Sequence, residues 1–354
     1  SVLGYGAGGA ITSGDYNVAI GGLALDANTT GGGNVAVGTS ALGANTTADG
    51  NTALGNDALA SNTTGTYNTA VGLSSLLANT TGVSNTAVGH NALKANTTGN
   101  YSVAVGELAL QANTTGQNVA IGQAAMIANT TGTGNVAIGT YDDAQLQPLK
   151  TNTTGDHNVA IGTGSMAVAT TSNDNTAVGY MSLRNLTTGT PNEAFGYRAG
   201  MSITTGASNA VFGSYAMDNA TATGYGNTVI GHGSGRAMTT AIQSTLVGSA
   251  AGDSITSGSG NVCIGYAAGH VFTTGGDNIY IGRNAGGAEY SAGTNRIVIG
   301  PDLNADGNNK VFIGKSGSAV SLNFTSSGSW SQSSDIRKKQ NIQNDTLGLD
   351  FIND

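Results

Sequence analysis

The side chains that most often carry out catalysis are few in this chain and lie far apart. The four histidines, His90, His157, His232 and His270, fall in different units of the sequence, and their spacing is not typical of a metal site. Carboxylates are scattered, and the single Cys263 has no partner for an internal disulfide. The Gly-x-Gly strings recur along the chain, so they do not indicate a nucleotide-binding loop. The sequence therefore predicts no enzyme active site before residue 334.

One stretch has the residue types of a cation site. Asp302, Asn304 and Asp306 alternate before Gly307, as ligands do at the start of a calcium-binding loop. The twelfth position of that loop is Ile313 rather than Glu, and the flanking sequence predicts no helices. Two interpretations stay open, a calcium site and a polar turn, and we expect no other cofactor.

These residues belong to a repeat that runs along almost the whole chain. Its phrase Asn-x-Ala-Val/Ile-Gly, for example residues 68–72, ends on a glycine that we call the anchor glycine. Thirteen of the eighteen intervals between anchors are 17 residues, and the others are 14, 16, 18, 18 and 23. A fixed period of this size predicts stacked coils that share one core. The anchors are Gly4, Gly21, Gly38, Gly55, Gly72, Gly89, Gly106, Gly122, Gly139, Gly162, Gly179, Gly196, Gly213, Gly231, Gly248, Gly265, Gly282, Gly300 and Gly314.

Each unit has the composition of β-structure. Leu, Ile, Val or Phe directly precedes every anchor, mostly Val or Thr lies three before it, and a small residue separates them. A helix would contain a Gly every few residues. We predict an all-β, parallel β-solenoid with two or three short strands per coil. The predicted core combines the residues before the anchors, including Val71, Val88, Val105, Ile121, Ile138, Ile264 and Ile281, with Leu42, Leu59, Leu76, Leu93 and Leu110.

Two kinds of unit differ in a way that identifies positions facing one narrow core. Units from Gly21 to Gly122 contain Ala-Leu-x-Ala-Asn-Thr-Thr-Gly, whereas the other kind contains Ala-Gly-x-x-Ile-Thr-Ser-Gly. Where the Leu becomes Gly, the Asn becomes apolar, as at Ile255. The small residue two before the anchor also grows, as at Leu246 and Tyr280. Close-packed interiors require such compensation of volume, so we expect these three positions to share the core.

The composition excludes several classes of protein. Only 9% of the residues are charged and 5% aromatic, while 57 are Gly. The net charge is −8 with no basic patch before residue 337, so we expect no nucleic-acid partner. We see no signal peptide and no apolar run long enough to cross a bilayer, so we expect no membrane insertion. Residues 1–4 begin inside a repeat phrase, so we expect the sequence to be part of a longer chain.

Two surface features are candidates for contact with other molecules. Six extra residues between Gly139 and Gly162 form an insertion that contains Tyr141, Asp142 and Asp143. We consider it both as a binding loop and as a tolerated surface insertion. Asn-Thr-Thr is formally a glycosylation acceptor, but we prefer a turn in which Asn side chains stack between coils. The regular spacing of the Thr-Thr pairs also allows a flat ice-binding face as an alternative. The acceptors are Asn28, Asn45, Asn62, Asn79, Asn96, Asn113, Asn129 and Asn152.

The phrase Asn-x-Ala-Val/Ile-Gly, followed by small residues, resembles the head repeat of YadA-like trimeric autotransporter adhesins. The resemblance covers roughly residues 1–314. It implies a homotrimer of left-handed parallel β-rolls that works as an adhesin. The usual repeat of that family is shorter than 17 residues, so the shape of its coil need not transfer to this chain.

Residues 334–342, Ser-Asp-Ile-Arg-Lys-Lys-Gln-Asn-Ile, and then Leu-Gly-Leu-Asp-Phe-Ile-Asn resemble the opening of another family. This family is the self-cleaving intramolecular chaperone of phage tail fibres and endosialidase tailspikes, and most of that domain is missing here. The resemblance implies that Ser334 begins the domain and that Lys339, five residues on, assists self-cleavage. A neutral Lys amine can take the proton of a Ser hydroxyl, provided that its pKa is lowered. The other interpretation is an ordinary helix start with Ser334 or Asp335 as the N-cap.

These expectations combine into one hypothesis of organisation and function. Residues 1–314 form a solenoid shaft or head, 315–333 a neck, and 334–354 a truncated chaperone segment with some helix. The chain is expected to be a homotrimeric, extracellular fibre on a virion surface that presents a receptor-binding surface to a host glycan or protein. Apart from the single self-cleavage, it is not expected to be an enzyme. The alternative is a cell-surface adhesin or an ice-binding repeat protein of non-viral origin.

Overall fold

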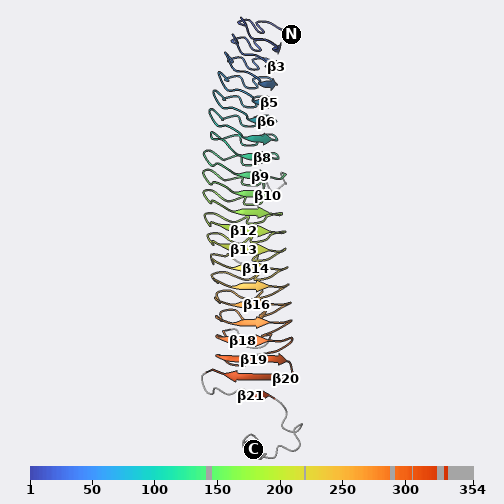
Figure 1. Cartoon of the computed structure of the whole chain (residues 1–354), viewed down its shortest axis with the longest axis vertical. Helices are drawn as coiled ribbons and strands as arrows, with labels where there is room; N and C mark the ends of the chain where they lie inside the picture. The colour runs from blue at the N-terminus through green and yellow to red at the C-terminus, as the bar shows by residue number, and fades with distance from the viewer. Residues whose placement is uncertain (141–145, 219–220, 288–291, 305, 325–330, 334–354) are drawn as a thin grey trace, which may run out of the picture.

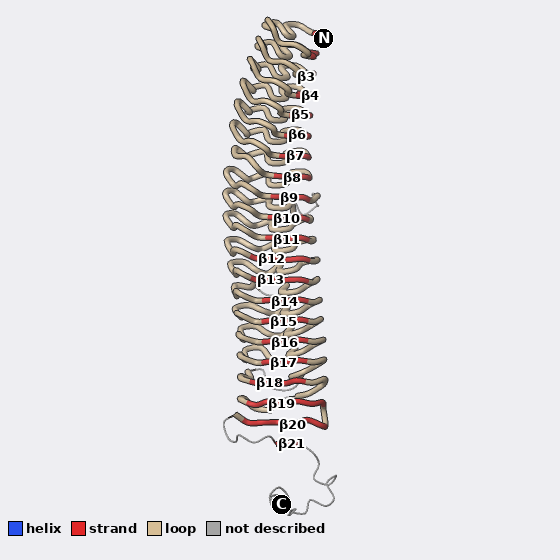
Figure 2. The backbone as a smooth tube through the Cα atoms, viewed as in Figure 1, coloured by secondary structure: helices blue, strands red, loops and turns tan. Residues whose placement is uncertain are grey.

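A computed structural model shows that the chain forms one long β-solenoid in which the coils stack along a single axis (Figure 1). The structure describes residues 1–140, 146–218, 221–287, 292–304, 306–324 and 331–333. Within these residues the regular elements are all strands, and turns and irregular segments connect them (Figure 2). No segment in these ranges forms the long apolar helix that would cross a lipid bilayer. The fold class predicted from the repeat is confirmed, whereas the expected C-terminal helix falls outside the described residues.

Each coil of the solenoid contains one short strand. The strands are β1 Val2–Leu3, β2 Val18–Ile20, β3 Val35–Val37, β4 Thr52–Leu54, β5 Thr69–Val71, β6 Thr86–Val88, β7 Val103–Val105, β8 Val119–Ile121, β9 Val136–Ile138, β10 Val159–Ile161, β11 Thr176–Val178, β12 Asn192–Phe195, β13 Asn209–Phe212, β14 Thr228–Ile230, β15 Thr245–Val247, β16 Val262–Ile264, β17 Ile279–Ile281, β18 Arg296–Ile299, β19 Lys310–Lys315, β20 Ser318–Asn323 and β21 Ser331–Ser333. The prediction of two or three strands per coil is therefore wrong. The rest of each coil turns too tightly to form further strands. Its backbone groups are paired instead by hydrogen bonds within turns and by hydrogen bonds to the adjacent coils.

The strands form one parallel sheet in which equivalent residues align. Ala70 of β5 lies opposite Ala53 of β4 and Ala87 of β6, and the same register relates successive strands from β1 to β19. β20 and β21 then pair in antiparallel orientation. Two strands from the segment expected to be a neck therefore extend the sheet of the shaft.

The core is a narrow column between the sheet and the opposite wall of the coil. From β2 to β18 the residue two before the anchor is buried, as Ala70 and Ala87 show, and so is the Leu four after the anchor, as at Leu76 and Leu93. The Asn seven after the anchor completes the interior, and Asn79 is also fully buried. The leucine column expected to join the core is confirmed.

The column directly before the anchors was predicted to be the core, and this prediction is wrong. Val88, Ile121 and Ile264 are 36 to 39% exposed, and Val71, Val105, Ile138 and Ile281 are only partly buried. Successive side chains of a strand point to opposite faces, so the buried residue two before the anchor forces both of its neighbours outward. The space between the sheet and the opposite wall holds little more than an alanine side chain in these coils.

The later coils confirm the volume compensation inferred from the sequence. Val229, Leu246, Cys263 and Tyr280 replace the inward Ala of the strand, and each is at most 1% exposed. In the same coils glycine replaces the Leu, and Met238, Ile255 and Phe272 replace the Asn; these are also at most 1% exposed. Burial raises the pKa of the Cys263 thiol, which is consistent with a structural role for this cysteine.

Backbone conformation explains both glycine positions. At the anchor Gly72, φ is +128°, and a Cβ would lie 2.7 Å from the carbonyl carbon of Gly89 in the next coil. An anchor glycine is therefore required for the coils to stack this closely. The leucine column adopts left-handed angles, with φ of +50° at Leu93. Glycine adopts that conformation without strain, so it replaces Leu in coils where other residues fill the core.

Candidate functional site

Two of the predicted sites fall outside the described residues. Ser334 and Lys339, the pair proposed for self-cleavage, lie in 334–354. Tyr141, Asp142 and Asp143 lie in 141–145. Directly after residues 141–145, Leu146 is buried and Leu149 lies in the leucine column. The chain therefore returns to the repeat directly after the insertion, and both predicted sites stay predictions.

The carboxylates of the predicted calcium loop are held by nitrogen donors. Asp302 accepts hydrogen bonds from Arg283 and, at 2.8 Å, from Nδ2 of Asn284. Nζ of Lys310 lies 2.9 Å from the Asp306 carboxylate, and Asn304 is exposed. In the ranges that the structure describes, no group of three or more His, Cys, Asp or Glu side chains is placed to hold a metal ion. The polar-turn interpretation explains this geometry without an ion, and calcium binding stays a prediction.

The Asn-Thr-Thr asparagines form a buried ladder. Nδ2 of Asn79 donates to Oδ1 of Asn62 at 2.8 Å and to the carbonyl of Gly82 at 3.0 Å, and Oδ1 of Asn79 accepts from Asn96 at 2.9 Å. All eight asparagines are fully buried. Their side chains are therefore inaccessible for glycosylation in the folded coil, as the turn interpretation predicts. A second buried ladder joins the asparagines that lie four residues before the anchors. For example, Oδ1 of Asn68 accepts a hydrogen bond from the backbone N–H of Asn85 at 2.9 Å.

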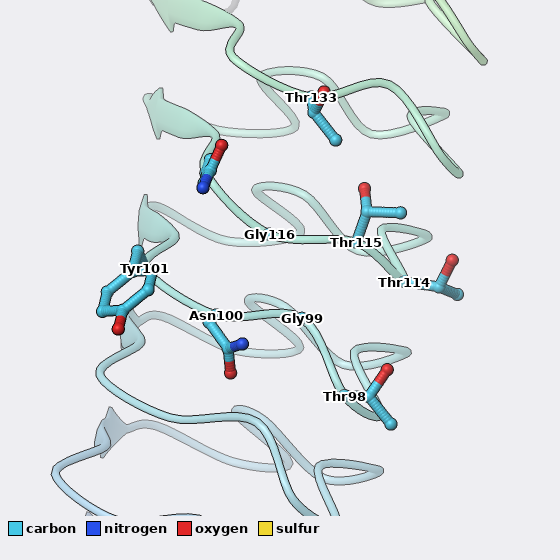
Figure 3. A pocket seen from close by; sticks show the side chains of 9 residues that line it. Thr98, Gly99, Asn100, Tyr101, Thr114, Thr115, Gly116 and Thr133 are labelled. Atoms are coloured by element: carbon cyan, nitrogen blue, oxygen red, sulfur yellow. The ribbon is translucent and has the colours of Figure 1, made fainter.

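A polar hollow lies beside one of the short coils. The coil between Gly106 and Gly122 has 16 residues, one fewer than the usual period, and a depression of about 400 Å³ lies beside it. Figure 3 shows its lining of Thr, Asn and Tyr side chains from successive coils. The asparagine ladder is interrupted at the same place. Within the described residues, the buried Oδ1 of Asn96 has no hydrogen-bond partner, because Asn113 turns its Nδ2 toward the carbonyl of Thr115. No charged side chain lines the hollow, so it offers a ligand hydrogen bonds and the ring of Tyr101.

Aromatic and charged side chains gather on the coils of β11 to β14. The ring centroids of Tyr180, Tyr197, Tyr215 and His232 follow one another at 5.3, 5.2 and 5.7 Å. Cζ of Arg198 lies 5.5 Å from the centroid of Tyr215. This cluster was not predicted from the sequence. The signal was a Tyr or His directly after the anchors Gly179, Gly196 and Gly231, but Tyr215 lies two residues after its anchor and breaks the pattern.

The outward face of the sheet is mostly apolar from β2 to β18. Large aliphatic or Phe side chains stand directly before each anchor, and mostly Val, Thr or Ile three before it. Glu193 is the one charged residue at these outward positions of β2 to β18, all of which the structure describes. The most exposed members include Ile20, Leu54, Ile121, Phe195, Phe212, Ile230 and Ile264, at 37 to 47%. Because the strands are in register, these side chains form two parallel columns along the rod. The column directly before the anchors is apolar throughout, and the column three before them mixes Val, Ile and Ala with Thr and Glu193.

Comparisons of the chain with protein-family models, with curated protein sequences and with solved structures found no match.

Proposed function

We propose that this protein is the rod of a homotrimeric fibre, in which the apolar faces of three sheets pack together and the remaining surface is free for adhesion. The observation that carries this proposal is the unbroken apolar column directly before the anchors on the outward face of the sheet. Soluble monomers rarely expose contiguous apolar patches larger than a few hundred Å². A column that continues from β2 to β18 is therefore best explained as an interface.

The slender coil supports association for a second reason. Its interior holds mainly Ala, Leu and Asn, with one strand per coil, so each chain buries little large apolar surface by itself. Packing the outward Val, Ile and Phe side chains of neighbouring chains together adds a second apolar core. The choice of three chains comes from the resemblance to trimeric adhesin heads.

The biological setting also comes from resemblance. The fibre would belong to a virus and attach it to a host surface, because residues 334–342 resemble the start of a tail-fibre chaperone. The protein would then act by holding a long surface in place and by binding a receptor. Single-turnover cleavage near Ser334 would be its only covalent chemistry.

Analytical ultracentrifugation of the chain tests the interface. The wild-type protein is expected to sediment with three times the chain mass. Val71→Glu with Val105→Glu puts two charges into the apolar column directly before the anchors, and this double variant should dissociate while retaining its β-type circular dichroism. The control, Thr64→Glu with Thr98→Glu, changes exposed residues of the Thr-Thr turns and should stay trimeric. A monomeric wild type, or equal dissociation of both double variants, would contradict the proposal.

One observation favours ice binding as a second candidate. The second threonines of the Asn-Thr-Thr turns are exposed in a regular row that includes Thr30, Thr47, Thr64 and Thr81. The first threonines are less available, because hydroxyls such as that of Thr63 donate to the carbonyl of the next coil at 3.0 Å. Thermal hysteresis of a solution of the protein would favour this candidate, and ordinary freezing would exclude it.

A further inference from the structure

The aromatic cluster on the coils of β11 to β14 contains a hollow made by a missing side chain. Tyr215, His232, Gly233 and Arg236 line a depression of about 270 Å³. Gly233 lies two residues after its anchor, where Tyr215 and Ala250 have similar left-handed angles, with φ of +59° and +54° against +63° for Gly233. A Cβ at Gly233 would meet no atom within 4 Å. The backbone therefore tolerates a side chain at this position, and its absence leaves the space open.

A second depression lies beside the first. It measures about 390 Å³, and Arg198, Ser202 and Asp218 are in its lining. Arg198 lines the second depression, and its guanidinium lies over the ring of Tyr215, which lines the first, so the two depressions are adjacent. We call the pair the groove; it is aromatic at Tyr215 and His232 and polar at Ser202 and Asp218.

A buried carboxylate orients one of the two arginines in this groove. Nε of Arg198 donates to Oδ1 of Asp218 at 3.2 Å, and the Asp218 side chain is only 3% exposed. The hydroxyl of Ser202 donates to the backbone carbonyl of Asp218 at 2.6 Å and fixes that residue further. Arg198 keeps about a third of its side chain exposed, so its guanidinium is held in place while still accessible from the groove.

The charges of the groove do not cancel. Arg198 and Arg236 are positive and Asp218 is negative, which leaves one positive charge in a chain whose net charge is −8. Asp253 lies one coil beyond Arg236, but no ion pair joins them in the part of the chain that the structure describes. An anionic ligand with a planar carboxylate would balance this charge, since guanidinium groups bind carboxylates through paired hydrogen bonds.

We propose that this groove binds a carboxylate-bearing pyranose of an acidic glycan. The apolar face of the sugar packs against Tyr215 and His232 above Gly233, its carboxylate pairs with Arg236, and neighbouring hydroxyls reach Arg198 and Ser202. The Tyr180 and Tyr197 rings continue the cluster along the rod, and because these two rings are stacked on each other, a longer glycan would meet their edges and hydroxyls. The proposal deepens the adhesive role proposed above and rests on it for its biological meaning.

Isothermal titration calorimetry with the full chain tests the site. The probes are oligosaccharides of glucuronic acid, of galacturonic acid and of N-acetylneuraminic acid, with a neutral glucose oligosaccharide of equal length for comparison. At least one acidic probe is expected to bind, and the neutral one at least about tenfold more weakly, which corresponds to about 1.4 kcal/mol. Which acidic probe binds identifies the source of the carboxylate. Added salt should weaken the binding.

Two variants with matched controls locate the binding. Gly233→Asn fills the hollow, and it should fold because Asn91 and Asn284 adopt φ of +57° and +50° at the same position of their coils. Gly233→Asn and Arg236→Gln should each weaken binding at least about tenfold. Tyr266→Ala and Arg283→Gln are the controls. Tyr266 is 60% exposed, directly follows its anchor, and has no ring contact among the described residues. Both controls should leave affinity within about twofold of wild type.

Three outcomes would overturn the site: no acidic probe binds, the neutral probe binds equally well, or Gly233→Asn binds like wild type. Ultracentrifugation of the same samples measures the oligomeric state, so failure of the groove can be distinguished from failure of the proposed trimer. A trimer that binds no acidic sugar refutes the groove alone. A monomer that binds through Arg236 refutes the trimer alone.

Discussion

Replacement of Leu93 by Ala tests the arrangement of the core. Leu93 is fully buried, and Leu76 and Leu110 hold the equivalent positions in the adjacent coils. Removing three buried carbon atoms at about 0.8 kcal/mol each costs about 2.4 kcal/mol in transfer free energy. The cavity costs more, because in-register hydrogen bonds such as Leu93 N to Ala109 O, at 3.0 Å, keep the coils from closing over it. We expect a total of about 4 kcal/mol, near the upper end for such substitutions.

The loss should be local, because each coil contacts only its neighbours. Native-state hydrogen exchange is therefore the appropriate assay, and protection should fall most for amides of the mutated coil and its two neighbours. Leu73→Ala is the matched control, since Leu73 is 48% exposed and should cost less than about 0.5 kcal/mol. A Leu93→Ala loss below about 1 kcal/mol, or one equal to that of Leu73→Ala, would show that the leucine column is not the core.

Two further predictions concern the broken ladder and the buried tyrosine. Inserting one Gly after Gly116 restores the 17-residue period, so Oδ1 of Asn96 should regain its partner and the unfolding free energy should rise by about 1 kcal/mol; an unchanged or lower denaturation midpoint would contradict this. Burial raises the pKa of Tyr280, and Arg296 opposes this shift with a smaller effect. As the pH rises, the folded state therefore keeps the phenol proton longer than the unfolded state does. The free energy of unfolding should then fall as the pH rises above about 10. Tyr280→Phe should flatten that part of a pH-dependent denaturation series, leaving the contribution of Cys263, whose pKa is also raised by burial; an unchanged slope would exclude Tyr280 as a source.

Periodicity was sufficient to predict the stacking of the chain. The 17-residue spacing predicts coils, and the alternation of branched and small residues predicts strands, which the in-register pairs of β2 to β19 confirm. Volume compensation identified three inward positions correctly from substitutions such as Leu246 and Ile255. Those same positions also contained the information needed to place Val88 outside, because a strand with its middle residue inward has both neighbours outward. The error arose from the assumption that the larger aliphatic residue must occupy the interior.

The groove was harder to predict because its contacts join different positions of successive coils. Arg198 lies two residues after its anchor, whereas Asp218 lies five after the next one. A repeat alignment shows which equivalent residues stack, as for Asn62 and Asn79, but it does not show which non-equivalent residues meet at a corner. The hollow above Gly233 is likewise visible only when the side chains of adjacent coils are in place.

The outward position of the residues directly before the anchors also bears on function. A large aliphatic or Phe residue precedes all nineteen anchors, although these side chains lie outside the core of the coil. The interior does not need them, since the inward Ala, Leu and Asn fill it. Water favours polar residues at such positions, and strands tolerate Thr there, as Thr69 and Thr86 show at the neighbouring outward position. An unbroken run of apolar residues on an outward face is therefore best explained by contact with other chains. In the fibre that we propose, each solenoid would supply part of a larger core, and its corners, including the groove at Arg236, would remain for contact with a receptor.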